Sequence, residues 1–395
     1  MLVMLWIDVA ERRRRLGVRH ALCPSSRSAD PVQAVRRVVA LHATDPASVF
    51  LAAWARTDSV APAAIAAALY EERTLVRMLG MRRTMFVVPT DLRPVIEEST
   101  MPRIAATQRR LLVKHLRELS NVSDPEPWLQ DVERSVLDAL AARGGMATAG
   151  QLSADEPRLC TQLVVAEGKP YQATQNITSR VLLLLGAQGH IVRGPPTGSL
   201  LSQRYQWSLA GQWLPPAGEL PPPVQARAEL ARRWLAAFGP APLTDLQWWT
   251  GWPKSEVARA AADLGARQVD LGGVVGMALP DDLDSTPDPG PWVALLPALD
   301  PTVMGWSDRG WFLGGHGKAL FDRSGNVGPT VWLDGRIVGG WAQRRAGQIA
   351  IRLLEDVGAD AAAMVDAEAA RLGEWLGALR VIPRFRTPLE RELSA

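Results

Sequence analysis

The chain has 395 residues, of which 47% are hydrophobic and 22% are charged. This ordinary globular balance excludes a wholly disordered chain, and the length predicts roughly two to four domains. The two cysteines, Cys23 and Cys160, exclude a disulfide framework and a thiolate zinc cluster. Because the sequence also lacks the usual metal-ligand, phosphate-loop and dinucleotide motifs, we expect neither a metal nor a cofactor.

The net charge of +3 is unevenly distributed along the chain. Residues 1–280 carry 32 basic and 25 acidic side chains, whereas residues 281–395 carry 12 and 16. Within the first part, residues 71–117 hold ten basic and five acidic groups. Nearly all the basic groups are arginines, which suit bidentate contacts to phosphate. A basic front and an acidic back indicate a protein that binds a polyanion on one side.

The apolar N-terminal run MLVMLWI is short and is followed by an acidic residue and then ERRRR. A signal peptide would have a longer apolar core, with its positive charge before that core. No apolar run reaches the length that spans a membrane. We therefore expect a cytoplasmic protein that does not act at a membrane.

The first unit is predicted to be helical and to end in a strand pair. Apolar periodicity predicts helices over residues 9–20, 31–43 and 61–79, and another helix begins at Pro46. Asp45, directly before Pro46, is a typical N-cap. The run RRTMFVVP that follows is rich in β-forming residues. Helices closed by a short strand pair are typical of a winged helix.

A second unit of the same kind follows. VERSVLDALAARG predicts an amphipathic helix that ends at a glycine pair, ATAGQLS begins the next helix, and another contains Val181 to Leu185. HIVRGPPTGSLLSQRYQWSLA predicts two strands around the turn-forming GPPTGS. This hairpin would be a second wing, and it contains Arg193 and Arg204 but no acidic residue.

PPAGELPPPVQ is a linker by composition, and a third unit follows it. ARAELARRWLAAF, LTDLQWWTGW and KSEVARAAADLGA predict the helices of a helix-turn-helix motif, with Thr244 or Asp245 capping the middle one. RQVDLGGVVGMALP supplies a last hairpin. Three such units would make a repeat of supersecondary structure. The spacing of Trp248, Trp249 and Trp252 favours core packing over base stacking.

After the acidic DDLDSTPDPGP, short β-type runs are separated by glycines. They are WVALLPALD, GWFLGG, PTVWLDGRIVGGWAQRR and QIAIRLL. VWLDGRIVGGW alternates around a DG turn, which is a strong hairpin signal. With an alanine-rich helix over residues 359–379, this part predicts a small barrel or sheet.

Taken together, these pieces resemble the AlkZ/YcaQ-type winged-helix DNA glycosylases over essentially the whole chain. The resemblance rests on RMLGMRRTMFVVPTDL, VRGPPTGSLLSQRYQWS, LTDLQWWTGWP, and LLPALDPTVMGWSDR with PTVWLDGRIVGGW. It implies an α+β fold in which three tandem winged helix-turn-helix motifs form a C-shaped DNA cleft, followed by a C-terminal β-barrel. We place the three winged-helix units at residues 1–122, 123–215 and 216–282 and the barrel at residues 283–395.

The resemblance also implies DNA as the partner and, in active members, hydrolysis of the N-glycosidic bond of alkylated or crosslinked purines. The family's catalytic signature is Gln-x-Gln or Gln-x-Asp after a leucine on the second helix. Here that place reads Leu41-His42-Ala43-Thr44-Asp45. His42 and Thr44 take the two signature positions without matching either, and Asp45 is one residue late, which rotates a helical side chain by about 100°. The chain is thus identified as a divergent member without the signature.

His42, Thr44 and Asp45 remain the catalytic candidates at that position. Breaking an N-glycosidic bond needs a stabilised oxocarbenium-like sugar and a positioned water. A neutral His42 could act as a general base, Thr44 could orient water, and Asp45 has the required charge. The structural alternatives are a helix-end histidine bonded to a carbonyl or phosphate, a threonine bonded to local backbone, and a capping aspartate.

The two wings supply the candidate DNA contacts. Arg82 and Arg83 begin the first wing and would meet phosphate, unless they pair with Glu71 or Glu72. In the second wing, a glycine- and proline-rich tip with arginine at its base suits insertion into a DNA groove. The alternative is an ordinary solvated hairpin. The second-wing candidates are Arg193, Ser199, Ser202, Gln203 and Arg204.

Two functional interpretations follow, and the catalytic position separates them. In the first, the protein is a monomer that binds duplex, branched or damaged DNA by shape, with weak or no base excision. In the alternative, it is a monofunctional DNA glycosylase for alkylated purines or crosslinks, with His42 and either Thr44 or Asp45 as its catalytic pair. A winged-helix transcription regulator fits less well, because such regulators seldom need 395 residues.

Overall fold

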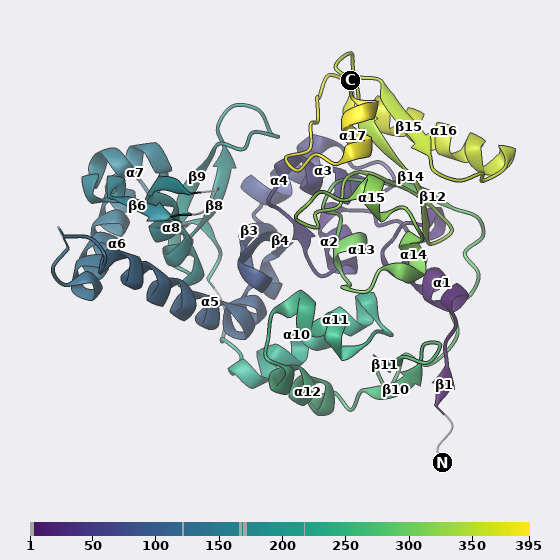
Figure 1. The fold of residues 1–395 in the computed structure, drawn as a ribbon, viewed down its shortest axis with the longest axis horizontal. Helices are drawn as coiled ribbons and strands as arrows, with labels where there is room; N and C mark the ends of the chain where they lie inside the picture. Colours follow the sequence, from purple (N-terminus) through teal and green to yellow (C-terminus); the bar gives the residue numbers. More distant parts are fainter. Residues whose placement is uncertain (1–3, 121, 166–167, 169–171, 217) are drawn as a thin grey trace.

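The structure, a computed structural model, describes residues 4–120, 122–165, 168, 172–216 and 218–395 and has a mixed α+β fold. Figure 1 shows one lobe, at the left, connected to the rest of the molecule by the long helix α5 (Arg93–Leu116). The first and third predicted units and the C-terminal sheet form the larger part at the right. In the described part of the chain, no helix is both long and apolar enough to cross a membrane.

The first predicted unit is helical and ends in a strand pair, as expected. Its elements before α5 are α1 (Val9–Arg19), α2 (Pro31–Arg37), β2 (Leu41–His42), α3 (Pro46–Trp54), α4 (Pro62–Tyr70), β3 (Leu75–Gly80) and β4 (Thr84–Pro89). The side chain of Asp45 accepts a hydrogen bond from the Ala47 amide and Pro46 follows it, which confirms the predicted cap. The antiparallel β3–β4 pair lies where the first wing was predicted, although only β4 was expected to be a strand.

Two helices predicted in this unit are shorter than expected. The helix predicted over residues 31–43 ends at Arg37, and Val39 turns the chain with a φ of 65°. The following residues form β2, which pairs with β4. The helix predicted over residues 61–79 ends at Tyr70, before β3. A short apolar run buried on both sides has no periodicity that separates a strand from a helix, and here strand pairing decided the outcome.

One six-stranded sheet joins the first two predicted units. Its strand order is β2-β4-β3-β8-β9-β5, where β5 is Met146–Thr148, β8 is Ile191–Pro196 and β9 is Tyr205–Leu209. The junction is the pairing of β3 with β8, at Arg77 and Arg193. Two arginines therefore lie where the units meet.

The second predicted unit is the lobe, and its expected elements are confirmed. The helix that precedes the glycine pair ends at Ala142, and Thr148 begins the next helix with a capping box. These two helices are α6 (Pro125–Ala142) and α7 (Ala149–Asp155). Besides β5, β8 and β9, the unit also contains β6 (Gln162–Val165), β7 (Ala173–Asn176), α8 (Thr178–Ala187) and α9 (Ala210–Trp213). The lobe has an apolar core of its own.

The third predicted unit contains the expected helices and hairpin. These are α10 (Pro223–Phe238), α11 (Leu243–Thr250), α12 (Lys254–Asp263), β10 (Arg267–Asp270) and β11 (Val275–Ala278), and the N-terminal β1 (Leu5–Trp6) pairs with β10. The predicted cap of α11 by Thr244 or Asp245 is wrong. The Asp245 carboxylate instead accepts hydrogen bonds from the Ser307 and Asp308 amides at 2.9 and 3.1 Å. A tertiary contact therefore occupies the carboxylate that was expected to cap α11.

The C-terminal part is an open sheet rather than the expected barrel. Its four described strands, β12 (Val293–Leu296), β13 (Thr330–Leu333), β14 (Arg336–Gln343) and β15 (Ile349–Leu353), pair in that order, which leaves β12 and β15 as edges. Helix α16 (Ala359–Leu376) packs against both edge strands. The sheet is therefore covered by a helix, and its edge strands do not pair with each other to close a barrel. The predicted DG turn is confirmed, with Asp334 and Gly335 both at positive φ.

Short helices surround this sheet, and one of them corrects a predicted strand. GWFLGG was expected to be β-type, but it contains α14 (Gly310–Leu313). The other short helices are α13 (Pro301–Met304), α15 (Gly317–Leu320) and α17 (Pro388–Leu393). A glycine-flanked apolar run of this length does not itself distinguish strand from helix.

A buried ion pair connects the first unit to the C-terminal part. Arg56 and Asp300, whose side chains are both 0% exposed, make two hydrogen bonds of 2.9 and 2.7 Å. Arg56 also donates to the Thr302 hydroxyl, which bonds Nδ1 of His20 at the end of α1. Nε2 of His20 lies 3.1 Å from the Ala237 carbonyl of α10, which fixes it as the donor.

Because His20 is fully buried and lies near Arg56, its pKa is well below the ordinary value, and it remains neutral. The aromatic rings of Phe238 and Trp306 pack beside it, with centroids 4.9 and 5.7 Å from its own. This network joins three of the four predicted units at one point.

We predict that Asp300→Asn lowers the free energy of unfolding by roughly 3–5 kcal/mol, because it leaves the buried Arg56 charge without a partner. Urea unfolding followed by tryptophan fluorescence measures the change. The control is Asp91→Asn in the pair with Arg36, whose side chains are 56% and 32% exposed. That change should cost less than about 1 kcal/mol. Equal losses in the two variants would contradict a central role for the buried pair.

Candidate nucleic-acid interface

The His42–Asp45 segment lies on strand β2 and on the turn into α3. His42 pairs with Phe86 of β4, and the Ala43 amide donates to the Met85 carbonyl at 2.8 Å. Arg77 of β3 is buried and donates to the Ala43 carbonyl from Nη2 and Nε, at 2.5 and 3.1 Å. Sheet pairing and one buried arginine therefore fix this segment.

His42 lies in an apolar setting, and the described residues offer its buried Nδ1 no hydrogen-bond partner. Its ring packs edge-on against Phe86, with centroids 5.6 Å apart. Burial lowers the pKa of His42 to about 4, and the positive charge of Arg82 contributes to the shift. At neutral pH the imidazole is uncharged, so it can accept a proton but cannot oppose a positive charge.

Both carboxylate oxygens of Asp45 are engaged in structural hydrogen bonds. Oδ1 accepts from the Ala47 amide at 3.1 Å, and Oδ2 accepts from the Arg384 amide at 2.9 Å. The side chain is only 3% exposed, and burial raises its pKa although these amides act in the opposite direction. Asp45 therefore holds the segment before α17 against the start of α3.

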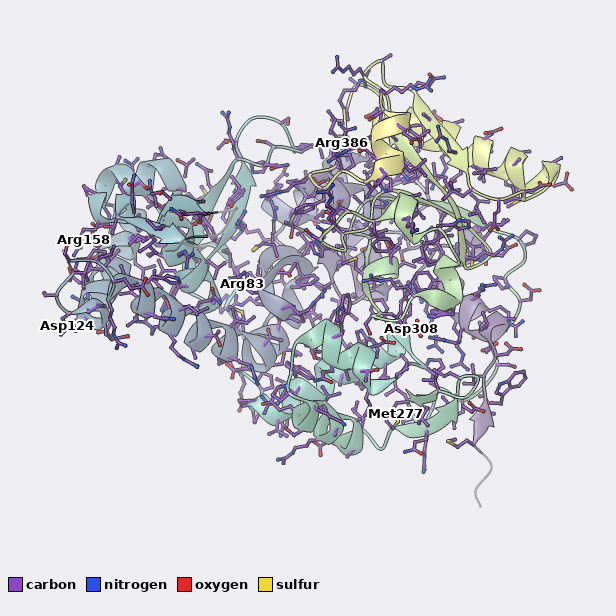
Figure 2. All side chains as sticks on the ribbon, viewed as in Figure 1. Arg83, Asp124, Arg158, Met277, Asp308 and Arg386 are labelled. Atoms are coloured by element: carbon purple, nitrogen blue, oxygen red, sulfur yellow. The ribbon has the colours of Figure 1, made fainter. Side chains whose placement is uncertain are left out.

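A cleft of about 750 Å³ lies between the first and second predicted units. Among the three catalytic candidates, only Thr44 lines it. Its charged lining consists of Arg83, Arg180, Arg193 and Arg384, and no acidic side chain belongs to its wall within the described residues. Figure 2 shows Arg83 between the lobe and the rest of the molecule.

Arg193 is stacked on aromatic rings inside this cleft. Its guanidinium carbon lies 3.5 Å from the ring centroid of Tyr205 and 4.7 Å from that of Trp207. Burial lowers the pKa of Arg193 to about 9, so the group stays charged at neutral pH. Stacking fixes the guanidinium in place, and its buried Nε has no hydrogen-bond partner among the described residues.

The two first-wing arginines have different surroundings. Arg82 stacks over Trp248 at 3.9 Å, and burial lowers its pKa to about 10. Arg83 is exposed and donates to the Gln108 side chain at 3.0 Å. Neither arginine makes an ion pair with Glu71 or Glu72 in the described structure. Only Arg83 of this pair lines the cleft.

Trp248 and Trp249 belong to α11, and Trp252 follows it after Gly251. Trp249 and Trp252 are each 3% exposed, as expected for core residues. Trp248 is only partly buried and carries Arg82 on its face. The αL residue Gly251 ends α11, and a Cβ there would lie 3.2 Å from Cγ of Arg82. The third unit therefore packs closely on the first wing.

The remaining second-wing candidates lie at the hairpin tip, away from the cleft wall. The Ser202 amide donates to the Ser199 carbonyl at 2.9 Å, and the Ser202 hydroxyl accepts from the Arg204 amide at 3.1 Å. Gln203 and Arg204 are exposed. The tip is thus an ordered turn with a free polar and cationic surface.

Three arginines of the candidate site were not predicted from the sequence: Arg180 and Arg384, which line the cleft, and the buried Arg77. Arg77 lies in what was expected to be a helix, and Arg180 is one arginine among many on an ordinary helix. Arg384 is distant in sequence from both wings and reaches the cleft through the bond to Asp45. Only the composition, rich in arginine, hinted at them.

A sequence profile of the family described as "DNA glycosylase AlkZ-like" matches residues 35–375. The chain belongs to the AlkZ-like DNA glycosylase family. Among solved structures, the Streptomyces sahachiroi DNA glycosylase AlkZ has a similar fold, with a TM-score of 0.72 at 18% identity. The match covers 95% of this chain and 99% of that one. No curated protein matches the sequence at a significant level. Membership of this DNA glycosylase family implies that DNA is the binding partner.

We predict that the His42 imidazole of this AlkZ-like protein stays neutral until the pH approaches about 4, because burial disfavours its charged form. Its histidine resonances, assigned with His42→Gln, would give the midpoint by NMR. Because this pKa is below the unfolded value of about 6.5, the unfolded chain binds a proton at this histidine before the folded protein does. The free energy of unfolding therefore decreases as the pH falls from 6.5 towards 4. His42→Gln should therefore be less acid-sensitive, and a midpoint near 6.5 would contradict the buried setting.

We predict opposite effects of Arg83→Gly on stability and on DNA binding. Arg82 and Arg83 have φ values of 53° and 61° at the turn between β3 and β4, a conformation that costs an arginine about 1 kcal/mol. Glycine at position 83 should raise the free energy of unfolding by about that amount and weaken duplex binding by removing a cleft charge.

Arg83→Lys is the matched control for this substitution. It keeps both the charge and the strained backbone, so neither quantity should change much. Thermal unfolding and fluorescence anisotropy with a labelled duplex give the two readouts. Loss of stability in Arg83→Gly would show that the side chain, not the backbone, governs this turn.

Proposed function

We propose that this protein binds duplex, branched or damaged DNA by shape in the cleft and carries out weak or no base excision. The observation that carries the proposal is the state of the catalytic candidates. Thr44 alone lines the cleft, and it has no charge. Both oxygens of Asp45 are occupied by backbone amides.

The chemistry of base excision supports this proposal. Hydrolysis of an N-glycosidic bond develops positive charge on the sugar, which a nearby carboxylate or amide oxygen stabilises. The described wall of the cleft offers no carboxylate, and its Gln108 and Gln175 amides come from other elements than the Thr44 turn. A threonine hydroxyl beside several arginines would favour neither the cation nor the loss of a cationic base.

The charge of the cleft suits a different ligand. Arg83, Arg180, Arg193 and Arg384 present a fixed positive potential that attracts phosphate groups and disfavours an alkylated, cationic base. Arginines fixed on aromatic rings also suit a narrowed minor groove, where the negative potential is enhanced. Recognition would then depend on the width and bending of the DNA.

The proposed DNA path involves all four predicted units. Residues 1–122, 123–215 and 216–282 would be three winged helix-turn-helix units around a C-shaped DNA path, with residues 283–395 as a fourth unit. The hairpin tip with Ser199, Ser202, Gln203 and Arg204 would enter a groove next to the cleft. Arg82 would support this surface through Trp248, and the protein would act as a monomer.

One observation favours the alternative, a monofunctional glycosylase. The buried Nδ1 of His42 has no partner among the described residues, and a neutral imidazole can accept a proton from water. This nitrogen could act as a general base if DNA binding placed a water between His42 and Thr44. Base release therefore has to be measured directly.

For binding, we predict that the logarithm of the affinity falls linearly with the logarithm of the salt concentration, because phosphate contacts release counterions. Arg180→Ala should weaken duplex binding severalfold and reduce the slope by about 0.9, the value for one phosphate contact. Arg134→Ala is the control, since Arg134 is 71% exposed on α6 and does not line the cleft. Equal behaviour of the two variants would contradict binding in the cleft.

For catalysis, we predict no release of purine from methylated duplex DNA, although the same duplex binds. Chromatography of the released bases would compare the wild type with His42→Ala. Release by the wild type and not by His42→Ala would establish the alternative, a glycosylase with a substitute base. Binding without release in both proteins would support a DNA-binding protein on a glycosylase scaffold.

A further inference from the structure

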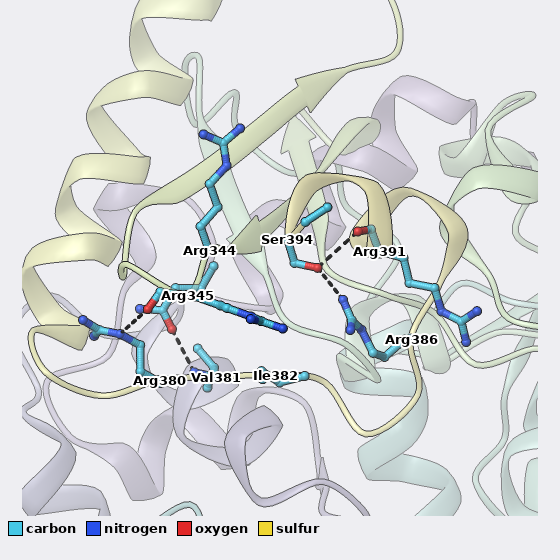
Figure 3. A pocket seen from close by; sticks show the side chains of 10 residues that line it. Arg344, Arg345, Arg380, Val381, Ile382, Arg386, Arg391 and Ser394 are labelled. Carbon is cyan, nitrogen blue, oxygen red and sulfur yellow. Dashed lines mark hydrogen bonds between the residues drawn. The ribbon is translucent and has the colours of Figure 1, made fainter.

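A second cavity, of about 860 Å³, lies in the C-terminal part, between the end of β14, the chain at residues 380–382 and helix α17. Figure 3 shows Arg345 reaching across its centre, towards Arg386 and Ser394. Five arginines line this cavity, and we call them the C-terminal arginine cluster: Arg344, Arg345, Arg380, Arg386 and Arg391.

Most of the charge of this cluster is uncompensated. Arg386 pairs with Glu390 at 2.7 Å, but it is the only member with a carboxylate within 4.0 Å in the described structure. Arg380 donates to backbone carbonyls alone, including those of Arg345 and Gly377. No acidic side chain lines the cavity within the described residues. Guanidinium groups that line one cavity give it a positive potential, which attracts an anion.

The cluster is continuous with the cleft through one short segment. Arg380 lies in the cavity, and Arg384, four residues later, lines the cleft beside Arg193. Four residues span at most about 14 Å. Phosphates on one strand of a duplex follow one another every 3.4 Å along the helix axis. A strand that passes Arg384 would therefore reach the cluster within roughly four nucleotides.

The cavity wall also suits a sugar-phosphate chain better than a single small anion. Ile382 is 65% exposed in the midst of the arginines. An apolar side chain in this position can contact deoxyribose, whereas it adds nothing to the binding of a free phosphate. Arginine can bridge neighbouring phosphate oxygens with its fork of donors.

We propose that the C-terminal arginine cluster binds the sugar-phosphate backbone of duplex DNA that flanks the cleft. This inference rests on the proposed function, in which the cleft itself holds DNA. The cluster contacts phosphate and sugar without reading bases, so it lengthens the footprint and adds affinity independently of sequence. It gives the C-terminal sheet a direct role in DNA binding.

The test is the affinity of the full-length double variant Arg345→Glu/Arg391→Glu for a labelled duplex of about 30 base pairs, which is long enough to pass both the cleft and the cluster. We expect at least tenfold weaker binding of this long duplex, with a salt slope lower by roughly 2, as two lost phosphate contacts require.

The control variant is Arg134→Glu/Arg323→Glu, which makes the same charge change at exposed positions outside both cavities. All four substituted arginines are exposed, so the variants should fold, which thermal unfolding verifies. Unchanged binding of the long duplex in the cluster variant overturns the proposal. Equal weakening in the control variant also overturns it, because the effect would then be one of total charge.

Arg180→Ala separates the failure of this inference from failure of the proposed function. If Arg180→Ala weakens binding of the long duplex while the cluster variant binds like the wild type, the cleft binds DNA and the cluster does not. If the wild type does not bind the duplex, the proposed function fails, and the inference fails with it.

Discussion

The buried pair of Arg56 and Asp300 is the constraint on which the arrangement of the units depends. It connects α3 to the chain after β12, and through Thr302 and His20 it reaches α10. Because neither charge contacts solvent, each is stabilised only while its partner stays in hydrogen-bonding geometry. The pair therefore tolerates little relative movement of the units. The cleft lies between this fixed block and the lobe formed by the second predicted unit, which has an apolar core of its own.

The same tertiary contacts that fix the His42–Asp45 segment also limit its chemistry. Arg77 holds the Ala43 carbonyl, and Asp45 joins α3 to the segment before α17. A carboxylate whose two oxygens both accept structural hydrogen bonds is not free to stabilise a cation. The arginines around Thr44 favour an anion in the same space. The proposed function, DNA binding with weak or no base excision, rests on these two features.

Much of the fold could be predicted from local patterns. The capping box at Thr148, the glycine pair after α6 and the DG turn at Asp334 each specify backbone geometry through neighbouring residues alone. The errors occur where distant segments decide. Leu75–Gly80 became a strand because it pairs with β4 and β8, and the C-terminal strands remained an open sheet because α16 covers both edges.

For the candidate site, the sequence by itself determined the family, the arginines of the two predicted wings and the identity of the residues from His42 to Asp45. Those features follow from residue identity and spacing, which are local. Only the tertiary structure decided that Thr44 faces the cleft while Asp45 faces the C-terminal part, and that Arg180 and Arg384 join Arg193 there. The direction of a side chain and the neighbours of a charge depend on contacts between residues hundreds of positions apart, and no local pattern encodes them.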